Sequence, residues 1–509
     1  MLRVNNLNVK IGDRGLINNL SFSLKNGDKL AIIGEEGDGK STLLKCIVNM
    51  KDLTYAQVSG TVNYENAKLG FLEQFLPSIW ENVSVEEYLL KDDVKDNIDY
   101  SNFEKLANIT PLFAKVKLNN KVYIDNQLVK TLSGGEKIKL QLVKILLNKP
   151  DIILLDEPSN DLDEESLLVL EKLIREFNGI VIFISHDETL IENCANCVLH
   201  LEQVKRKSEN IWHFERMKYA DYLLKRKQQI DRQESIALKQ QEEIKIREEK
   251  WQKIYQQVHN DLNSISRQDP HSGRLLKKKM KSVKAQERRF EKIKENVTEF
   301  LAPEEAITLK FKNKDIPNNK CMLDFYADKL VAGDKVLANN VSLRIFGADR
   351  VVVTGKNGAG KTTLLNSLYE TLKNQNTVYM TQNYDEILNK FDSVDEYIKS
   401  FCFDKENITR AKTYLGGLKF TSEEMNAKIS NLSGGQKGKL FLLKLVILSP
   451  DYLLLDEPTR NFSPLTNPVL RKVLKEYNGV LIAVSHDKKF IDEVGKTVYA
   501  LTKNGLVKT

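Results

Sequence analysis

Long apolar runs are missing from this sequence of 509 residues. Its apolar stretches, such as residues 152–155 and 179–184, have only the length of a β-strand. A membrane-spanning helix needs about 20 apolar residues, so membrane-spanning proteins are excluded as a class. The first residues also lack a charged and then apolar leader, so we predict no secretion signal and expect a cytoplasmic protein.

Cysteines are few, and their pattern excludes a disulfide framework. Cys46, Cys194, Cys197, Cys321 and Cys402 form an odd, scattered set. The single CxxC pair has no second pair to complete four zinc ligands, and no strand-then-helix start of the kind that a redox motif has. We therefore interpret these cysteines as small buried hydrophobic residues.

The composition that is present is that of an ordinary globular protein. Hydrophobic residues make up 41% of the chain and charged residues 29%, unlike a disordered chain. The length is too great for a single core, so two or three domains are expected.

Four short motifs occur twice along the chain, which indicates a tandem duplication. The pairs are GEEGDGKST at 34–42 with GKNGAGKTT at 355–363, LSGGE at 132–136 with LSGGQ at 432–436, LLDEP at 154–158 with LLDEP at 454–458, and SHD at 185–187 with SHD at 485–487. The last three pairs keep a constant offset of 300 residues. Something is therefore inserted between two related halves.

Each glycine-rich motif follows an apolar strand, at residues 30–33 and 351–353. Its backbone N–H groups are expected to converge on phosphate oxygens at the start of a helix, whose dipole favours negative charge. Lys40 and Lys361 are predicted to reach the β and γ phosphates of ATP. The hydroxyls of Ser41 and Thr362 are predicted to ligate Mg²⁺.

Acidic residues complete each predicted phosphate site. Asp156 and Asp456 each end a buried strand and are expected to hold the same Mg²⁺ ion. Glu157 and Glu457 follow them, where they can orient or deprotonate the attacking water. Two loops, each followed by its acidic partner, predict two sites that hydrolyse ATP.

The Leu-Ser-Gly-Gly motifs open helices, and alone each would be interpreted as a helix N-cap. Together with the glycine-rich loops, they make the sequence resemble the ATP-binding-cassette superfamily, in which each ATP lies between the loop of one half and the signature of the other. The resemblance implies an α/β fold with two tandem nucleotide-binding domains. It implies a first site made of Gly34, Gly37, Gly39, Lys40, Ser41, Thr42, Gln74, Asp156, Glu157 and His186, facing Ser433, Gly434 and Gly435. It implies a second site made of Gly355, Gly358, Gly360, Lys361, Thr362, Thr363, Gln382, Asp456, Glu457 and His486, facing Ser133, Gly134 and Gly135.

Two features of these sites depend on the resemblance. A lone histidine at the end of an apolar strand is usually a capped core residue, but the matched positions of His186 and His486 favour catalytic contacts with the γ-phosphate. Cassettes often stack adenine on an aromatic ring about 23 residues before the loop, and Ile11 and Ala332 stand there instead. Strict selectivity for adenine is therefore not predicted.

The insertion between the halves is predicted to be a helical hairpin, dividing the chain into domains at 1–204, 205–300 and 301–509. A first helix, over residues 220–262 and about 64 Å long, is predicted from apolar residues at steps of seven. These are Leu223, Ile230, Ala237, Ile244, Trp251 and Val258. A second helix carries Leu276, Met280, Val283 and Phe290, and a turn-forming segment at 267–273 separates the two.

Positive charge gathers near the far end of this hairpin. Residues 263–289 hold nine basic and two acidic residues. Their net charge of +7 equals that of the whole chain. The basic residues are Arg267, Arg274, Lys277, Lys278, Lys279, Lys281, Lys284, Arg288 and Arg289. A charge run is often only a solvated face. Beside the tip of a projecting hairpin, it predicts contact with nucleic-acid phosphates.

This arrangement resembles the F branch of the superfamily, whose twin cassettes bind the ribosome in the tRNA exit site. Residues 157–163 resemble the usual Glu-Pro-Thr-Asn-His-Leu-Asp of that branch, with Ser159 and Asp161 as departures. Residues 457–464 resemble the antibiotic-resistance members, which protect the ribosome from lincosamides, pleuromutilins and streptogramin A. The resemblance implies a monomer that contacts large-subunit rRNA and peptidyl-tRNA. It also implies a drug-clearing tip made of Ile265, Ser266, Arg267, Gln268, Asp269, Pro270 and His271.

Three other functions remain open. Housekeeping translation factors of the F branch often carry an extra helical arm in the first half. Here 59 positions separate Gln74 from Ser133, against 51 from Gln382 to Ser433. The first half therefore has no room for a long arm, which favours protection. A subunit that energises a transporter is disfavoured by the basic hairpin. A DNA-maintenance ATPase is the stronger rival, although such proteins usually insert their coil inside one cassette.

Overall fold

The computed structural model describes most of the chain. The described residues are 1–12, 14–90, 127–160, 162–204, 209–264, 274–283, 285, 311, 316–418, 420, 422–460 and 462–509. They form two units, one comprising Met1–Tyr219 with Glu304–Thr509 and the other Ala220–Pro303. Within the larger unit, we call Met1–Tyr219 the first half and Glu304–Thr509 the second half. The predicted boundaries at 204/205 and 300/301 fall beside or among residues outside those described, so they stay predictions.

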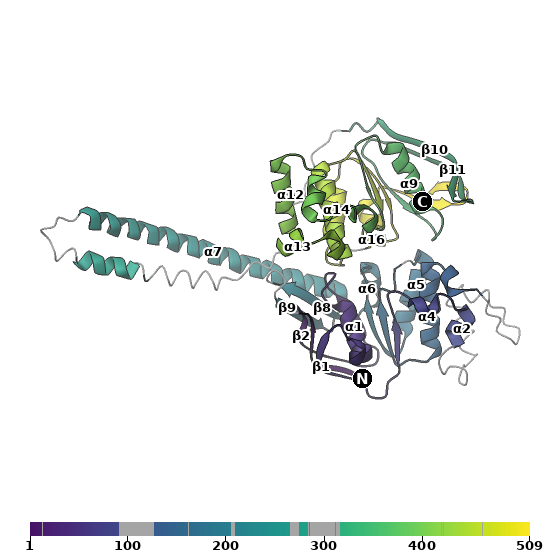
Figure 1. Cartoon of the computed structure of the whole chain (residues 1–509), viewed down its shortest axis with the longest axis horizontal. Coiled ribbons are helices and arrows are strands. Elements are labelled where there is room, and N and C mark those ends of the chain that lie inside the picture. Colours follow the sequence, from purple (N-terminus) through teal and green to yellow (C-terminus); the bar gives the residue numbers. More distant parts are fainter. Residues whose placement is uncertain are drawn as a thin grey trace. The chain divides into compact units, whose positions relative to one another are not determined.

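The first half combines a small antiparallel sheet with a larger, mainly parallel one (Figure 1). The small sheet has the order β2-β1-β4, and the large sheet the order β5-β6-β7-β3-β8-β9, in which only β9 is antiparallel to its neighbour. Its strands are β1 Leu2–Ile11, β2 Arg14–Leu24, β3 Lys29–Ile33, β4 Gln57–Asn63, β5 Leu69–Leu72, β6 Ile152–Asp156, β7 Ile180–Ile184, β8 Cys197–Val204 and β9 Glu209–Glu215. Its helices are α1 Lys40–Asn49, α2 Val85–Leu90, α4 Gly134–Leu147, α5 Glu164–Glu176 and α6 Glu188–Cys194.

The second half repeats the large sheet strand for strand. Its order is β13-β14-β15-β12-β16-β17, again with only the last strand antiparallel, and β10 pairs with β11 in a separate hairpin. The strands are β10 Cys321–Ala332, β11 Lys335–Phe346, β12 Arg350–Thr354, β13 Thr377–Met380, β14 Tyr452–Asp456, β15 Val480–Val484, β16 Thr497–Thr502 and β17 Gly505–Lys508. The helices are α9 Lys361–Leu372, α10 Asp385–Leu388, α11 Val394–Lys399, α12 Lys405–Gly417, α13 Ser422–Asn426, α14 Gly434–Leu448, α15 Asn467–Lys475 and α16 Lys488–Val494.

The central strands of the two six-stranded sheets show the burial expected of parallel strands. Every residue of β3, β6, β7, β14 and β15 is buried, as expected of strands that helices cover on both faces. Such strands are continuous apolar runs, and their carboxyl ends meet at one edge of the sheet. Three of the four repeated motifs lie at carboxyl ends of the parallel strands in each half, and the Leu-Ser-Gly-Gly motif opens α4 or α14 instead.

The linker contains the long helix α7 Tyr219–Ser264, drawn in teal in Figure 1. It exceeds the predicted 220–262 by a few residues. Residues 274–283 form a second helix, and Trp251 Nε1 of α7 donates to Val283 O at 3.0 Å. Val258 and Val283 are buried, so the predicted apolar seam holds the two helices together where both are described. In the part of the chain that the structure describes, no helix is long and apolar enough to cross a membrane.

Candidate active sites

In each half, three neighbouring parallel strands end in the three motifs expected to handle ATP. The glycine-rich loop follows β3, Glu157 follows β6, and His186 follows β7, and these strands are adjacent in the order β6-β7-β3. The second half brings its loop, Glu457 and His486 together in the same way, through β14-β15-β12. Sheet topology therefore assembles residues that lie more than 100 positions apart in the sequence.

The two glycine-rich loops adopt conformations that require glycine. Gly39 precedes α1 with a φ of 88°, and Gly360 precedes α9 with a φ of 99°, both in the left-handed region. A Cβ at Gly34 would lie 2.4 Å from Leu201 O, so no larger residue fits there. The loops thereby expose the first N–H groups of α1 and α9, as phosphate binding requires.

Lys40 and Lys361 are buried, and each holds its own loop closed. Lys40 Nζ donates to Gly34 O at 2.9 Å and to Glu35 O at 2.8 Å. Lys361 Nζ donates to Gly355 O at 2.7 Å and to the carbonyl of the next residue at 3.2 Å. These carbonyl contacts place an ammonium group inside each loop, where an incoming phosphate would meet it.

The predicted Mg²⁺ ligands lie together in both halves. Ser41 Oγ donates to Asp156 Oδ1 at 3.0 Å, and Thr362 Oγ1 donates to Asp456 Oδ2 at 2.8 Å. Burial raises the pKa of Asp156 to about 6 and also raises that of Asp456. A hydroxyl and a carboxylate oxygen, completed by phosphate oxygens, form the donor set that Mg²⁺ prefers, so the residues present fit this ion.

Glu157 and Glu457 are held in an uncommon backbone conformation. Their φ angles are 50° and 48°, a region that costs a residue other than glycine about 1–3 kcal/mol. The conformation directs each carboxylate to the following strand, where it accepts from the backbone N–H of His186 at 3.2 Å or His486 at 3.3 Å. Strain at two matched acidic residues is typical of a catalytic position.

The histidines differ between the sites. His186 Nε2 lies 3.0 Å from Glu157 Oε1, whereas His486 Nε2 lies 3.9 Å from Glu457 Oε1. Burial would raise the pKa of Glu157, but His186 and Lys40 offset it and the net pKa falls below its usual value. Burial and the neighbouring Asp456 raise the pKa of Glu457 to about 7, and burial lowers that of His486 to about 4.

Each signature motif caps its helix. Ser133 Oγ accepts from Glu136 N, and the carboxylate of Glu136 accepts from Ser133 N at 2.8 Å. Ser433 and Gln436 repeat this capping box in the second half. The interpretation of these serines as helix caps therefore describes their side chains. The N–H groups of the glycines that follow lie in the first turn, where a helix offers them no partner of its own.

At the second site, every predicted residue except Gly355 lines one cavity of about 620 Å³, within the usual range for ligand pockets. Ser133, Gly134, Gly135, Gly358, Gly360, Lys361, Thr362, Thr363, Gln382, Asp456, Glu457 and His486 all line it. Ala332 and Leu337 line it from β10 and β11. The position of the usual aromatic ring is therefore occupied by short aliphatic side chains.

At the first site, the signature of the second half contacts a residue that the sequence reasoning missed. The carboxylate of Glu36 accepts from Gly434 N at 3.0 Å and from Gly435 N. Lys439 Nζ adds an ion pair with Glu35 at 3.2 Å. The two N–H groups predicted to face ATP are thus bonded to the opposing phosphate loop. The sequence carried a signal of this difference between the loops. The first loop has three acidic residues, and the matched positions of the second loop have none: Glu35, Glu36 and Asp38 against Lys356, Asn357 and Ala359.

Several predicted residues receive less structural support. Gln74 follows β5 and is exposed, and Ile11 ends β1. Arg274, Lys277, Lys278, Lys279 and Lys281 are exposed on the second linker helix, and we call them the hairpin basic stretch. The predicted tip residues 265–271, together with Lys284, Arg288 and Arg289, lie outside the described residues.

Comparison with known proteins agrees with this geometry. The family described as ABC transporter matches residues 17–160 and 338–460, together just over half of the chain. This chain belongs to the ABC transporter family. Its two ABC domains bind and hydrolyse ATP, so the chain is an ATPase, and the predicted fold class of two tandem cassettes joined by a helical hairpin is confirmed.

Curated relatives of this ABC protein match along nearly its whole length. The ATP-binding protein Uup of Buchnera aphidicola is 27% identical over 100% of this chain and 82% of its own. The ribosome protection protein VmlR of Bacillus subtilis is 28% identical over 100% of this chain and 88% of its own. ABC transporter F family member 2 of Arabidopsis thaliana is 26% identical over 99% and 77%.

Solved structures show the same fold. The archaeal ribosome recycling factor aABCE1 superposes with a TM-score of 0.60 at 15% identity, over 97% of this chain and 88% of that one. An RNase-L inhibitor superposes with a TM-score of 0.57 at 15% identity, over 100% and 90%.

Proposed function

We propose that this protein is an F-branch ABC ATPase that binds the ribosome and protects it from antibiotics of the peptidyl-transferase centre. In this proposal, the protein is a cytoplasmic monomer whose partners are large-subunit rRNA and peptidyl-tRNA. ATP with Mg²⁺ bound at the two sites holds the halves together on the ribosome. Hydrolysis then releases the protein.

The chemistry at each site is derived from the chain's own residues. The loop N–H groups and Lys40 or Lys361 bind the phosphates, and Asp156 or Asp456 would hold the Mg²⁺ that neutralises developing charge. Glu157 and Glu457 orient the attacking water. Because the signature N–H groups come from the opposite half, binding and hydrolysis are coupled to closure of the halves.

The observation that carries ribosome binding is the hairpin basic stretch. Its five cations are exposed within ten residues that contain no acid. A helix of this charge attracts nucleic-acid phosphates strongly and without sequence preference. The apolar seam between α7 and the second helix stiffens the hairpin that carries these cations.

The relatives support the ribosome as the partner. VmlR is described as a ribosome protection protein and aABCE1 as a ribosome recycling factor, and VmlR matches this chain along its whole length. Uup and the F family member match equally well, so a housekeeping translation factor of the F branch is a second candidate. The segment between Gln74 and Ser133 has no room for a long helical arm, which favours protection, although much of it lies outside the described residues.

Two experiments test the proposal in order. Co-sedimentation with 70S ribosomes, compared with duplex DNA binding at the same salt concentration, should show ATP-dependent binding to ribosomes alone. Expression in a susceptible bacterium should then raise resistance to lincosamides, pleuromutilins or streptogramin A. Ribosome binding without resistance to any ribosomal antibiotic would replace protection by the housekeeping function. Preferential DNA binding would refute both.

A further inference from the structure

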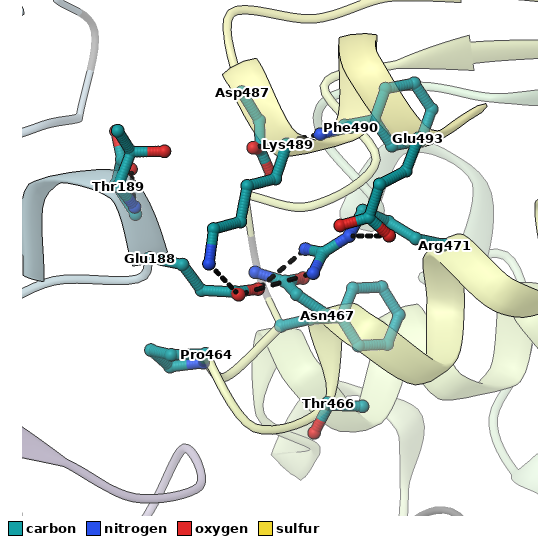
Figure 2. Close-up of polar contacts among 12 residues, drawn as sticks. Glu188, Thr189, Pro464, Thr466, Asn467, Arg471, Asp487, Lys489, Phe490 and Glu493 are labelled. Atoms are coloured by element: carbon teal, nitrogen blue, oxygen red, sulfur yellow. Dashed lines mark hydrogen bonds and ion pairs between the residues drawn. The ribbon is translucent and has the colours of Figure 1, made fainter. Parts of the chain in front are cut away.

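A buried group of charges joins the two halves outside both ATP sites (Figure 2). Glu188 is the first residue of α6 in the first half, and Arg471 lies on α15 in the second half. Arg471 donates from Nη1 to Glu188 Oε1 at 2.6 Å and from Nη2 to Oε2 at 3.3 Å, and both side chains are only 3% exposed. Lys489 adds a contact with Glu188 Oε2 at 3.1 Å, and Arg471 Nε lies 3.1 Å from Glu493.

A bidentate pair of this kind fixes geometry more than it adds stability. The planar guanidinium matches a carboxylate in one orientation, and two parallel hydrogen bonds set both distance and angle. Removing one partner would leave a buried charge without its counterion. The pair therefore fixes where α15 lies against the start of α6.

The chain on either side of this pair leads to the first ATP site. Two residues before Glu188 stands His186, and its carbonyl accepts from Asn467 Nδ2 at 3.3 Å. His186 Nδ1 lies 2.7 Å from Phe462 O, and its Nε2 lies 3.0 Å from Glu157 Oε1. One segment of the second half, from Phe462 to Arg471, thus contacts the ring and the backbone of this histidine, and also the side chain of Glu188 two residues further on.

The contact with Phe462 decides how His186 is oriented. A carbonyl oxygen can only accept, so Nδ1 must carry the hydrogen and donate it. The ring is thereby anchored by one nitrogen and presents the other, Nε2, to Glu157. This second-half carbonyl orients a first-half histidine much as an outer hydrogen bond orients a ring in other catalytic sites.

The matched positions at the second site lack this arrangement. At the offset of 300 residues, Leu167 replaces Asn467 and cannot donate, and Lys488, which is exposed, replaces Glu188. Glu171 replaces Arg471 and accepts from Asn193 of its own half. Among the described residues, buried His486 Nε2 has no hydrogen-bond partner.

We propose that Arg471 is a positioning residue for the first ATP site only. By pairing with Glu188, it holds α15 and Asn467 in the position from which the second half orients His186 toward Glu157. The orientation of the catalytic histidine at the first site then depends on this contact with the second half, and His486 at the second site has no matching contact through Leu167 or Glu171. The inference rests on the proposed role of Glu157 and is independent of ribosome binding.

Single-turnover hydrolysis of ATP by excess full-length protein without ribosomes tests this proposal, because it does not require the halves to reopen. Glu457→Gln leaves the first site active, and Glu157→Gln leaves the second. In the first background, Arg471→Met should lower the rate about tenfold or more, since a small misplacement of a catalytic group costs up to about a hundredfold. ATP affinity should stay within twofold, and Arg471→Lys should recover part of the rate.

Asn467→Leu, which copies the second-site residue, should slow the first site without removing a charge. It also keeps the test valid if Arg471→Met fails to fold. Lys488→Gln is the matched control and should change neither site. Equal losses at both sites, or no loss at the first, would refute the proposal. Undiminished first-site hydrolysis after Glu157→Gln would instead refute the catalytic assignment on which it rests.

Discussion

Replacing Glu36 by asparagine should raise the affinity of the first site for ATP, because the Glu36 carboxylate is bonded to the two signature N–H groups that ATP is proposed to use. The second site carries Asn357 at the matched loop position. The substitution therefore converts one loop toward the other within the same chain.

The structure sets the magnitude of this effect. A hydrogen bond to a charged group is worth about 1.5–3 kcal/mol. Glu36 is exposed, so solvent screening reduces the two bonds together to about 1–2 kcal/mol. At about 1.4 kcal/mol for each factor of ten, the first site should bind ATP about 5- to 30-fold more tightly. Loss of one negative charge from a loop that also holds Glu35 and Asp38 acts in the same direction.

The assay is a titration with a fluorescent ATP analogue at fixed Mg²⁺. Lys361→Met disables the second site, so that binding reports the first. Asn357→Glu in a Lys40→Met background is the converse control and should weaken the second site by a similar factor. An unchanged or weaker first site after Glu36→Asn would show that the signature N–H groups are not shared between Glu36 and ATP.

Four further results are expected. Glu157→Gln with Glu457→Gln should retain ATP binding, abolish turnover and trap the protein on ribosomes, and undiminished ATPase activity would contradict the catalytic assignment. Replacing the lysines of the hairpin basic stretch by glutamine should flatten the salt dependence of ribosome binding. The log–log slope should fall by about 0.7–0.9 for each phosphate that the helix no longer neutralises. An unchanged slope would mean that these lysines only form a solvated face and do not bind the ribosome. Replacing residues 265–271 by a Gly-Ser turn should spare ATPase activity and remove resistance, as growth on the drugs would show. Because the pKa of Asp156 is about 6, its carboxylate becomes protonated as the pH falls from 7 to 5. The affinity of the first site for Mg²⁺ should therefore drop about tenfold over this range. A Mg²⁺ titration of Asp156→Asn should show no such pH dependence.

Much of this protein was predictable from local sequence. A glycine-rich loop after an apolar strand, an acidic pair ending another strand, and a constant offset between copies depend on backbone conformation and short-range chemistry. These features predicted the cassette fold and the pairs Ser41 with Asp156 and Thr362 with Asp456. The sevenfold apolar spacing predicted α7 for the same reason, since helical periodicity is a local property.

Only the tertiary structure decided how the two sites differ. Glu36 meets Gly434 across nearly 400 residues of sequence, and Arg471 meets Glu188 across 283, so no motif in either half predicts these contacts. The orientation of His186 likewise depends on a backbone carbonyl of Phe462, and a carbonyl leaves no trace in residue identity. The sequence by itself determined two nearly identical sets of ATP-binding residues. The packing of one half on the other made them unequal, because an interface between related but different surfaces places different groups against matched positions.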